Sequence, residues 1–122
     1  MVPGEDRHAV RAVVLSESEE VLLVRVRRPG GAPVWMTPGG GLLPGESSES
    51  GLRRELHEEL GLAPVALGPL LWQRRHLFQW GAKTVRQYEE FFLVPVPERF
   101  EPRMSDEVEA EAVEELRWWS LD

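Results

Sequence analysis

The stretch GGGLLPGESSESGLRRELHEELGL, from Gly39 to Leu62, decides the fold of this chain. Three glycines open it, and a helix is expected to start near Ser47 or Ser48, because either serine can cap the first turn. Gly61 can end this helix in the left-handed conformation that glycine adopts readily. A leucine at every fourth position predicts the buried stripe of the helix, which consists of Leu52, Leu56 and Leu60.

Three glutamates of the predicted helix, Glu55, Glu58 and Glu59, have spacings that place them on one face, with the leucines turned elsewhere. Like charges at these spacings destabilise a helix by only about 0.2–0.5 kcal/mol per pair, so a solvated surface could carry them. Alternatively, three converging carboxylates form a site of hard oxygen ligands suited to Mg²⁺ or Mn²⁺. The glycines in front of the helix favour the metal site, because glycine lets the backbone approach a ligand closely.

The length of the chain, 122 residues, suits a single domain over residues 1–122. There is no cysteine, which excludes disulfides and thiolate metal sites. The formal net charge of -7 argues against general nucleic-acid binding, but it allows a small anionic substrate held by a divalent cation. The sequence has no apolar run long enough to cross a membrane and no signal peptide at its start, so we expect a cytoplasmic protein.

Aliphatic and β-branched segments on both sides of this stretch predict a β-sheet. The segments 8–15 and 21–28 suggest an antiparallel hairpin, and 67–78 and 85–96 suggest two long strands joined by a turn. The segment 113–121 suggests a last strand, whereas the proline- and glycine-rich stretch 28–41 and the polar stretch 97–112 are expected to be loops. The sum is a mixed sheet with one helix, in the α/β or α+β class.

The spacing of these residues resembles the Nudix box of the Nudix hydrolases, with MutT-like features. The box runs over residues 40–62 and has seven positions of fixed identity and two aliphatic positions. The probability that the seven identities coincide by chance is on the order of 10⁻⁸ per start position. In order, the matching residues are Gly40, Glu46, Arg54-Glu55-Leu56, Glu58-Glu59 and Gly61-Leu62. The resemblance implies a Nudix-type αβα sandwich with a mixed sheet. Family members usually continue past a segment like WWSLD into another helix, whereas this sequence ends at Asp122. We therefore expect that helix to be missing or shortened. Its absence would expose apolar surface, which we expect a second copy of the chain to cover in a homodimer.

The resemblance also implies an activity, a cofactor and residue roles. Nudix enzymes cleave a diphosphate linked to another group, typically a nucleoside, with the help of Mg²⁺ or, in its place, Mn²⁺. By the family's pattern, Glu55, Glu58 and Glu59 are metal ligands, the Gly40 carbonyl adds another oxygen, and Glu46 supports a second metal ion. Arg54 is expected to orient the glutamates through charge-assisted hydrogen bonds rather than to touch the substrate. The alternative is a Nudix-fold module that senses a nucleotide without cleaving it, but none of these glutamates is degenerate.

The general base of such an enzyme lies outside the box in many family members. The acidic segment SDEVEAEAVEEL offers several glutamates, of which we favour Glu111 by its distance from RWW. The same segment could be a solvated acidic loop. Alternatively, Glu58 or Glu59 activates water directly while it binds metal.

Basic and aromatic residues supply candidates for substrate binding. Arg25 and Arg27 share one face of their strand and could bind phosphates or simply be exposed. Trp35 could stack on a base or pack beneath the glycine loop. Around the second hairpin, Tyr88 and its aromatic neighbours could form a stacking platform or stabilise the strands: these neighbours are Trp72, Phe78 and Trp80.

Two more sets of charged residues have an open role in the sequence. Arg74, Arg75 and His76 raise the same choice between phosphate binding and exposure. Glu89 and Glu90 are adjacent in a strand and must face opposite sides, so one of them points inward or toward the cleft. A buried carboxylate is costly without a partner, which could be Arg25 or the substrate.

Overall fold

The computed structural model of this protein describes residues 4–62, 66–103 and 113–122. It contains seven strands and one helix, in the order β1 (Gly4–Ser16), β2 (Glu20–Val26), β3 (Val34–Met36), β4 (Gly39–Gly41), α1 (Ser48–Leu60), β5 (Leu70–Trp80), β6 (Lys83–Val96) and β7 (Val113–Ser120). The predicted hairpins, the helix and the last strand are therefore confirmed.

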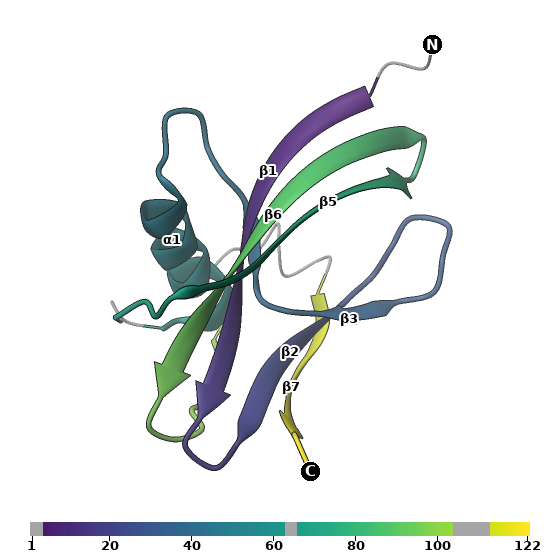
Figure 1. Cartoon of the computed structure of the whole chain (residues 1–122). Coiled ribbons are helices and arrows are strands. Elements are labelled where there is room, and N and C mark those ends of the chain that lie inside the picture. Colours follow the sequence, from purple (N-terminus) through teal and green to yellow (C-terminus); the bar gives the residue numbers. More distant parts are fainter. Residues whose placement is uncertain (1–3, 63–65, 104–112) are drawn as a thin grey trace.

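The strands form one mixed sheet with the order β3-β2-β1-β6-β5, to which β4 is added beside β1 and β7 beside β2. The long pair β1 and β6 is parallel, from Gly4 opposite Thr84 to Ser16 opposite Val96. The other pairs are antiparallel, including the β1–β2 hairpin that the sequence predicts. In Figure 1, β1, β6 and β5 run side by side as a strongly curved layer, with α1 beside it. This mixed, curled sheet confirms the α/β class.

The stretch 28–41 is not only a loop, as the sequence suggested, because it contains the short strands β3 and β4. Strand β4 pairs with β1, with Gly39 opposite Arg11 and Gly40 opposite Val10. A side chain at Gly39 would place its Cβ 2.0 Å from the Val10 carbonyl oxygen, and the φ angle of Gly39 is 139°. Glycine is therefore needed here so that the two backbones can pair closely. In the sequence alone, a run of glycines indicates a turn or loop instead.

Helix α1 has the caps that the sequence predicts. Ser47 is its N-cap and accepts a hydrogen bond from the backbone N–H of Ser50 at 3.2 Å, and Gly61 ends it at φ 68°. The leucine stripe is fully buried against one face of the sheet, together with Val10, Ala12, Val14, Leu22, Val94 and Val96. Burial of such side chains contributes about 1.5–3 kcal/mol each, so this stripe fixes the helix on the sheet.

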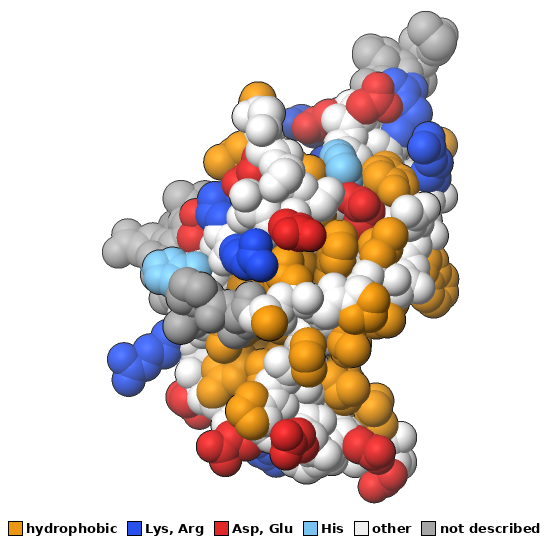
Figure 2. Space-filling view, turned by 60° about the vertical axis from the view of Figure 1, so that its left-hand side comes forward, with side chains coloured by type: hydrophobic (Ala, Val, Ile, Leu, Met, Phe, Trp, Pro, Cys, Tyr) orange, Lys and Arg blue, Asp and Glu red, His pale blue; other side chains and the backbone are white. Residues whose placement is uncertain are grey.

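The second helical layer of the expected αβα sandwich is absent from the described residues, where α1 is the one helix present. No described helix is long and apolar enough to span a lipid bilayer. The edge strand β5 carries exposed large apolar side chains, namely Leu70, Leu71, Trp72 and Leu77. Figure 2 shows hydrophobic side chains gathered in a band down the middle of one face of the molecule.

Candidate active site

The spacing of Glu55, Glu58 and Glu59 suggested that all three lie on one face of α1, away from the leucines. The structure differs from this prediction. Glu55 and Glu59 are 4% and 6% exposed, lie on the same side as the buried leucines and line a cavity of about 540 Å³. Glu58 is only half-buried and is not among the residues that line this cavity. The reason is the geometry of the helix, since Glu55 and Glu59 are one turn apart, whereas Glu58 is rotated toward the solvent.

Arg54 connects the glutamates of the box to the glycine loop. Its Nε and Nη2 donate to the two carboxylate oxygens of Glu46 at 2.8 and 3.0 Å. Its Nη1 donates to Glu55 at 3.0 Å and to Glu58 at 3.1 Å, and Nη2 also donates to the Gly41 carbonyl at 3.1 Å. These contacts fit the expected orienting role of Arg54.

The electrostatics of the pair formed by Arg54 and Glu46 follow from these bonds. The hydrogen bond from Arg54, helped by the backbone N–H of Leu43 at 2.9 Å, lowers the pKa of Glu46 to about 2. The same hydrogen bond from Glu46 raises the pKa of Arg54 above its ordinary value. Both oxygens of Glu46 are engaged, so this residue holds the loop before the helix.

Gly40 and Glu55, which both line the cavity, are in tight contact. A Cβ at Gly40 would lie 2.7 to 2.8 Å from the carboxylate atoms of Glu55, so only glycine leaves room for this side chain. The Oε2 atom of Glu55 is buried and has no hydrogen-bond partner. An unpaired buried carboxylate oxygen is costly, and a cation at this point would remove the cost.

The residues at this point fit a divalent cation. Glu55 and Glu59 offer hard carboxylate oxygens to the cavity, which Mg²⁺ and Mn²⁺ prefer. Within residues 4–62, 66–103 and 113–122, no three acidic or histidine side chains are already gathered closely enough to hold a metal ion by themselves. Helix α1 therefore contributes two carboxylates to the cavity, those of Glu55 and Glu59.

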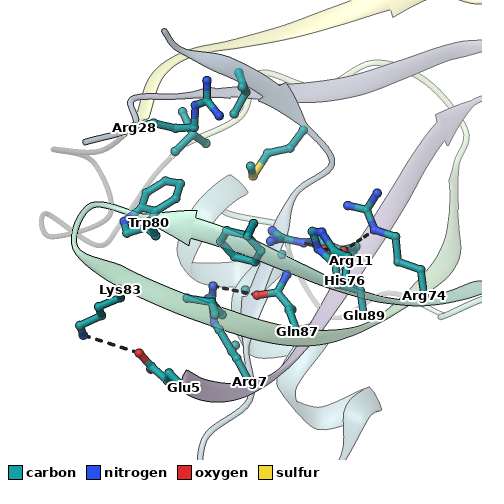
Figure 3. A pocket seen from close by; sticks show the side chains of 18 of the residues that line it. Glu5, Arg7, Arg11, Arg28, Arg74, His76, Trp80, Lys83, Gln87 and Glu89 are labelled. Carbon is teal, nitrogen blue, oxygen red and sulfur yellow. Dashed lines mark hydrogen bonds and ion pairs between the residues drawn. The ribbon is translucent and has the colours of Figure 1, made fainter. Parts of the chain in front are cut away.

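Glu89 of β6 also lines the cavity, is 3% exposed and gathers basic side chains around its carboxylate. It accepts hydrogen bonds from Arg11 Nε at 3.1 Å and from Arg74 Nε at 2.6 Å, and His76 Nε2 lies 3.0 Å away. Figure 3 shows Arg11, His76 and Arg74 gathered around this carboxylate. Burial alone would raise the pKa of Glu89, but Arg74 and Arg11 together outweigh it and lower the pKa below its ordinary value.

Arg7 lies between Glu89 and the hairpin end of the cavity. Its Nη1 donates to the side-chain oxygen of Gln87 at 3.3 Å, and its guanidinium group lies against the backbone of Gly41. Burial, and then the nearby charge of Arg11, lower the pKa of Arg7. In the described part of the chain, Arg7 has no ion pair with a carboxylate, so its charge is available to an anion in the cavity.

The residues that the sequence suggested for substrate binding do not line this cavity. Arg25 and Arg27 both pair with Glu114 at 3.4 Å, on the side of β2 opposite Val26, which lines the cavity. Trp35 packs edge-on against Trp119, with ring centroids 5.2 Å apart.

Tyr88 is also outside this cavity, because it occupies the opposite face of β6 from Glu89. Its ring lies 4.9 Å from that of His8, and Arg75 stacks on it. Glu90 lies on the same face as Tyr88 and binds His8 and Ser48, both at 2.6 Å. Glu111, the predicted general base, lies outside the described residues.

Sequence reasoning missed Arg7, Arg11 and the partner of Glu89. One signal was available: Arg7 and Arg11 are four residues apart in a strand and so share a face, as do Gln87 and Glu89 in theirs. Only the parallel register of β1 and β6 shows that these two faces are the same face of the sheet. Arg25, the suggested partner of Glu89, is instead on another strand and bonded to Glu114.

Comparison with known proteins places the chain in a family. The family model of the NUDIX domain matches residues 5–122. A putative 8-oxo-dGTP diphosphatase 2 of Mycobacterium tuberculosis is 35% identical over 100 residues, which cover 80% of this chain and 70% of that protein. An RNA pyrophosphohydrolase of Coxiella burnetii is 43% identical over 58 residues, which cover 48% of this chain and 25% of that protein.

The matched region spans only 25% to 31% of the length of three of these relatives, two RNA pyrophosphohydrolases and a putative 8-oxo-dGTP diphosphatase. Among solved structures, a MutT NUDIX hydrolase from Burkholderia pseudomallei is similar with a TM-score of 0.76 and 26% identity, covering 96% of this chain and 84% of that one. A MutT protein from Methanosarcina mazei is similar with a TM-score of 0.71 and 26% identity, covering 99% and 81%. From the box, the fold and these similarities we conclude that the chain belongs to the Nudix family.

Proposed function

We propose that this protein is a divalent-metal-dependent pyrophosphohydrolase, which cleaves the diphosphate linkage of a nucleoside di- or triphosphate or of a nucleotide-linked diphosphate. The names of the relatives, RNA pyrophosphohydrolase and 8-oxo-dGTP diphosphatase, support hydrolysis of such a bond. The observation that carries the proposal is the buried, unpartnered Oε2 of Glu55 against the backbone of Gly40, at the end of a cavity lined by arginines.

Each side chain has a distinct role in this proposal. Glu55 and Glu59 hold the cation, Glu58 supports the site from the solvent side, and Arg54 keeps the carboxylates oriented. When bound, Mg²⁺, or Mn²⁺ in its place, supplies charge neutralisation of the phosphates and lowers the pKa of an attacking water. Arg7 supplies positive charge for phosphate oxygens that the cation does not neutralise.

The proposed reaction adds water across a P–O–P bond. The water oxygen attacks phosphorus, the bridging P–O bond breaks, and the released proton passes to a carboxylate. Glu111 remains the proposed acceptor of this proton, with Glu58 or Glu59 as alternatives. In the cavity, the ion pairs around Glu89 hold Arg11 and Arg74 in place, so the phosphates meet a fixed set of positive charges.

A panel of nucleotides and dinucleotides with Mg²⁺, scored for release of phosphate, pyrophosphate and monophosphate, tests the activity. We expect turnover of at least one substrate, and a loss of about 100-fold or more in kcat for Glu59→Gln and Glu58→Gln. Glu49→Gln is the matched control, because its side chain is 67% exposed on the same helix. Full activity in both variants of the box would show that the metal assignment is wrong, and binding without turnover would favour the ligand-sensing alternative.

A further inference from the structure

The cavity has two chemically different parts. One part, the charged half, is formed mainly by β1, β6 and α1 and contains Arg7, Arg11, Arg74, Glu55, Glu59 and Glu89. The other part, the apolar half, is formed by β2, β3, β7 and the end of β5 and contains Val26, Val34, Met36, Phe78, Trp80 and Val113. A ligand that fills both parts must carry an anionic end and a flat or apolar end.

Trp80 is the large aromatic side chain of the apolar half without a stacking partner. The chain has five tryptophans, and the other four each lie against another aromatic ring. No aromatic ring or guanidinium group of the described chain stacks on Trp80, which is only half-buried and lines the cavity. Its ring is therefore available to a flat ligand, and Figure 3 shows Arg28 facing it across this end of the cavity.

The polar side chains beside the apolar half already have partners in the protein. Gln79 donates to Thr84 Oγ1 at 2.9 Å, and Lys83 pairs with Glu5 at 3.6 Å. Arg28 donates from Nε to the Ala32 carbonyl at 2.8 Å, which leaves its guanidinium group as one wall of this part. Apart from the terminal nitrogens of Arg28, the described side chains at this end of the cavity thus offer surface for stacking rather than a set of hydrogen bonds matched to one base.

We propose that the apolar half binds the base of a nucleotide by stacking on Trp80, and that it does so without distinguishing among the bases. This inference rests on the proposed function, which places the phosphates in the charged half. Every base has a flat face, so binding by stacking tolerates all of them. Apolar contacts separate similar ligands by about 10- to 200-fold, whereas a site built to hydrogen-bond a base edge rejects the wrong one by about 10⁴-fold or more.

Two measurements test the inference. The first is kcat/KM for ATP, GTP, CTP and UTP with Mg²⁺, for which we expect values within about tenfold of one another. The second is quenching of tryptophan fluorescence by the same nucleotides in EDTA, which reports binding without hydrolysis. Trp80→Leu should weaken binding of all four by a similar factor, about tenfold to a hundredfold, and should remove most of the quenching.

The controls separate a local effect from a general one. Trp72→Leu is the matched control, because Trp72 is on the same strand, is 63% exposed and does not line the cavity. Trp80→Phe keeps an aromatic ring and should retain most of the affinity, even if Trp80→Leu folds poorly. A preference above about 1,000-fold for one base, or unchanged binding in Trp80→Leu, would overturn the inference. Quenching that depends on Trp80 but comes without hydrolysis would support this base site and contradict the proposed activity. If neither quenching nor hydrolysis is seen, the base site and the proposed activity are both overturned.

Discussion

The guanidinium group of Arg54 and the carboxylate of Glu46 form a two-point hydrogen-bonded pair, at 2.8 and 3.0 Å, across eight residues of chain. Because Arg54 also reaches Glu55, Glu58 and the Gly41 carbonyl, this pair links the loop before α1 to the glutamates on it. The geometry of the proposed metal site therefore depends on a residue that does not itself line the cavity.

Replacing Glu46 by glutamine should change how the stability of the protein depends on pH. The pKa of Glu46 is lowered to about 2 by Arg54, from an ordinary value of about 4.3. A lowered pKa contributes stability that is present above about pH 4.3 and is lost as the pH falls toward 2. Urea unfolding between pH 2 and 6 should give a shallower decline for Glu46→Gln than for the wild type. Glu49→Gln is the control, and parallel curves for Glu46→Gln and the wild type would contradict the role of this pair.

Replacing Arg54 by lysine should weaken metal binding even though the charge is kept. A lysine ammonium group cannot reproduce the fork that bonds Glu46 while it also reaches two other glutamates. Loss of a residue that orients ligands typically lowers metal affinity by about 10- to 100-fold. Calorimetry with Mn²⁺ measures this change, with Arg53→Lys as the control, since Arg53 is exposed on the same helix and does not line the cavity. Equal affinity in Arg54→Lys and wild type would show that the network is not needed for the site.

Replacing Gly40 by alanine should displace the Glu55 carboxylate. The added Cβ would lie 2.7 to 2.8 Å from it, and overpacking of this kind costs about 1–3 kcal/mol. We expect lower stability and a loss of Mn²⁺ affinity, measured by thermal unfolding and calorimetry. Gly31→Ala is the control, because a Cβ there meets only the flexible end of Arg28, at 3.4 Å. A variant Gly40→Ala that binds the metal as the wild type does would place the cation elsewhere.

Removing Glu89 should destabilise the protein strongly, because it leaves the side chain of Arg11, which is 10% exposed, without its partner. Breaking a buried pair on one side costs about 3–5 kcal/mol, so we expect that loss for Glu89→Leu. The double variant Arg11→Met with Glu89→Leu should be more stable than the sum of the single effects predicts. Chemical denaturation of the four proteins gives the coupling, and strictly additive losses would mean that the pair does not act as a unit.

Dimer formation remains a prediction from the exposed apolar surface. Strand β5 is at the edge of the sheet and carries Leu77, which is 66% exposed, and unpaired edges with apolar side chains favour association. Sedimentation at micromolar concentration should give about twice the chain mass of 13.9 kDa. Leu77→Glu should restore the monomer, whereas Leu43→Glu, at an exposed site outside β5, should not. A clean monomer for the wild type would refute this prediction.

The box and its helix could be predicted from the sequence because their signals are local. Ser47, Gly61 and the leucine stripe are each read from a few neighbouring residues, and the structure confirms all three. The short strand β4 could not be read in this way, since three glycines indicate a loop unless the pairing partner in β1 is known.

The walls of the cavity depend on contacts far apart in the sequence, and there the predictions were weakest. Alternation correctly gave Arg25 and Arg27 a common face, but it could not say that Val26, between them, faces the cavity. Likewise, the sequence shows that one of Glu89 and Glu90 faces inward, but Arg11 and Arg74 become its partners only through the order of the strands.

The parallel pairing of β1 with β6 also bears on how fast the molecule reaches its native state. Arg11 and Glu89, which are hydrogen-bonded across this pair of strands, are 78 positions apart in the sequence. Contacts of such separation must overcome loop-closure entropy, and chains rich in them fold slowly. Helix α1, with its caps and local spacing, is suited to form early, whereas the cavity can close only after both distant strands have met.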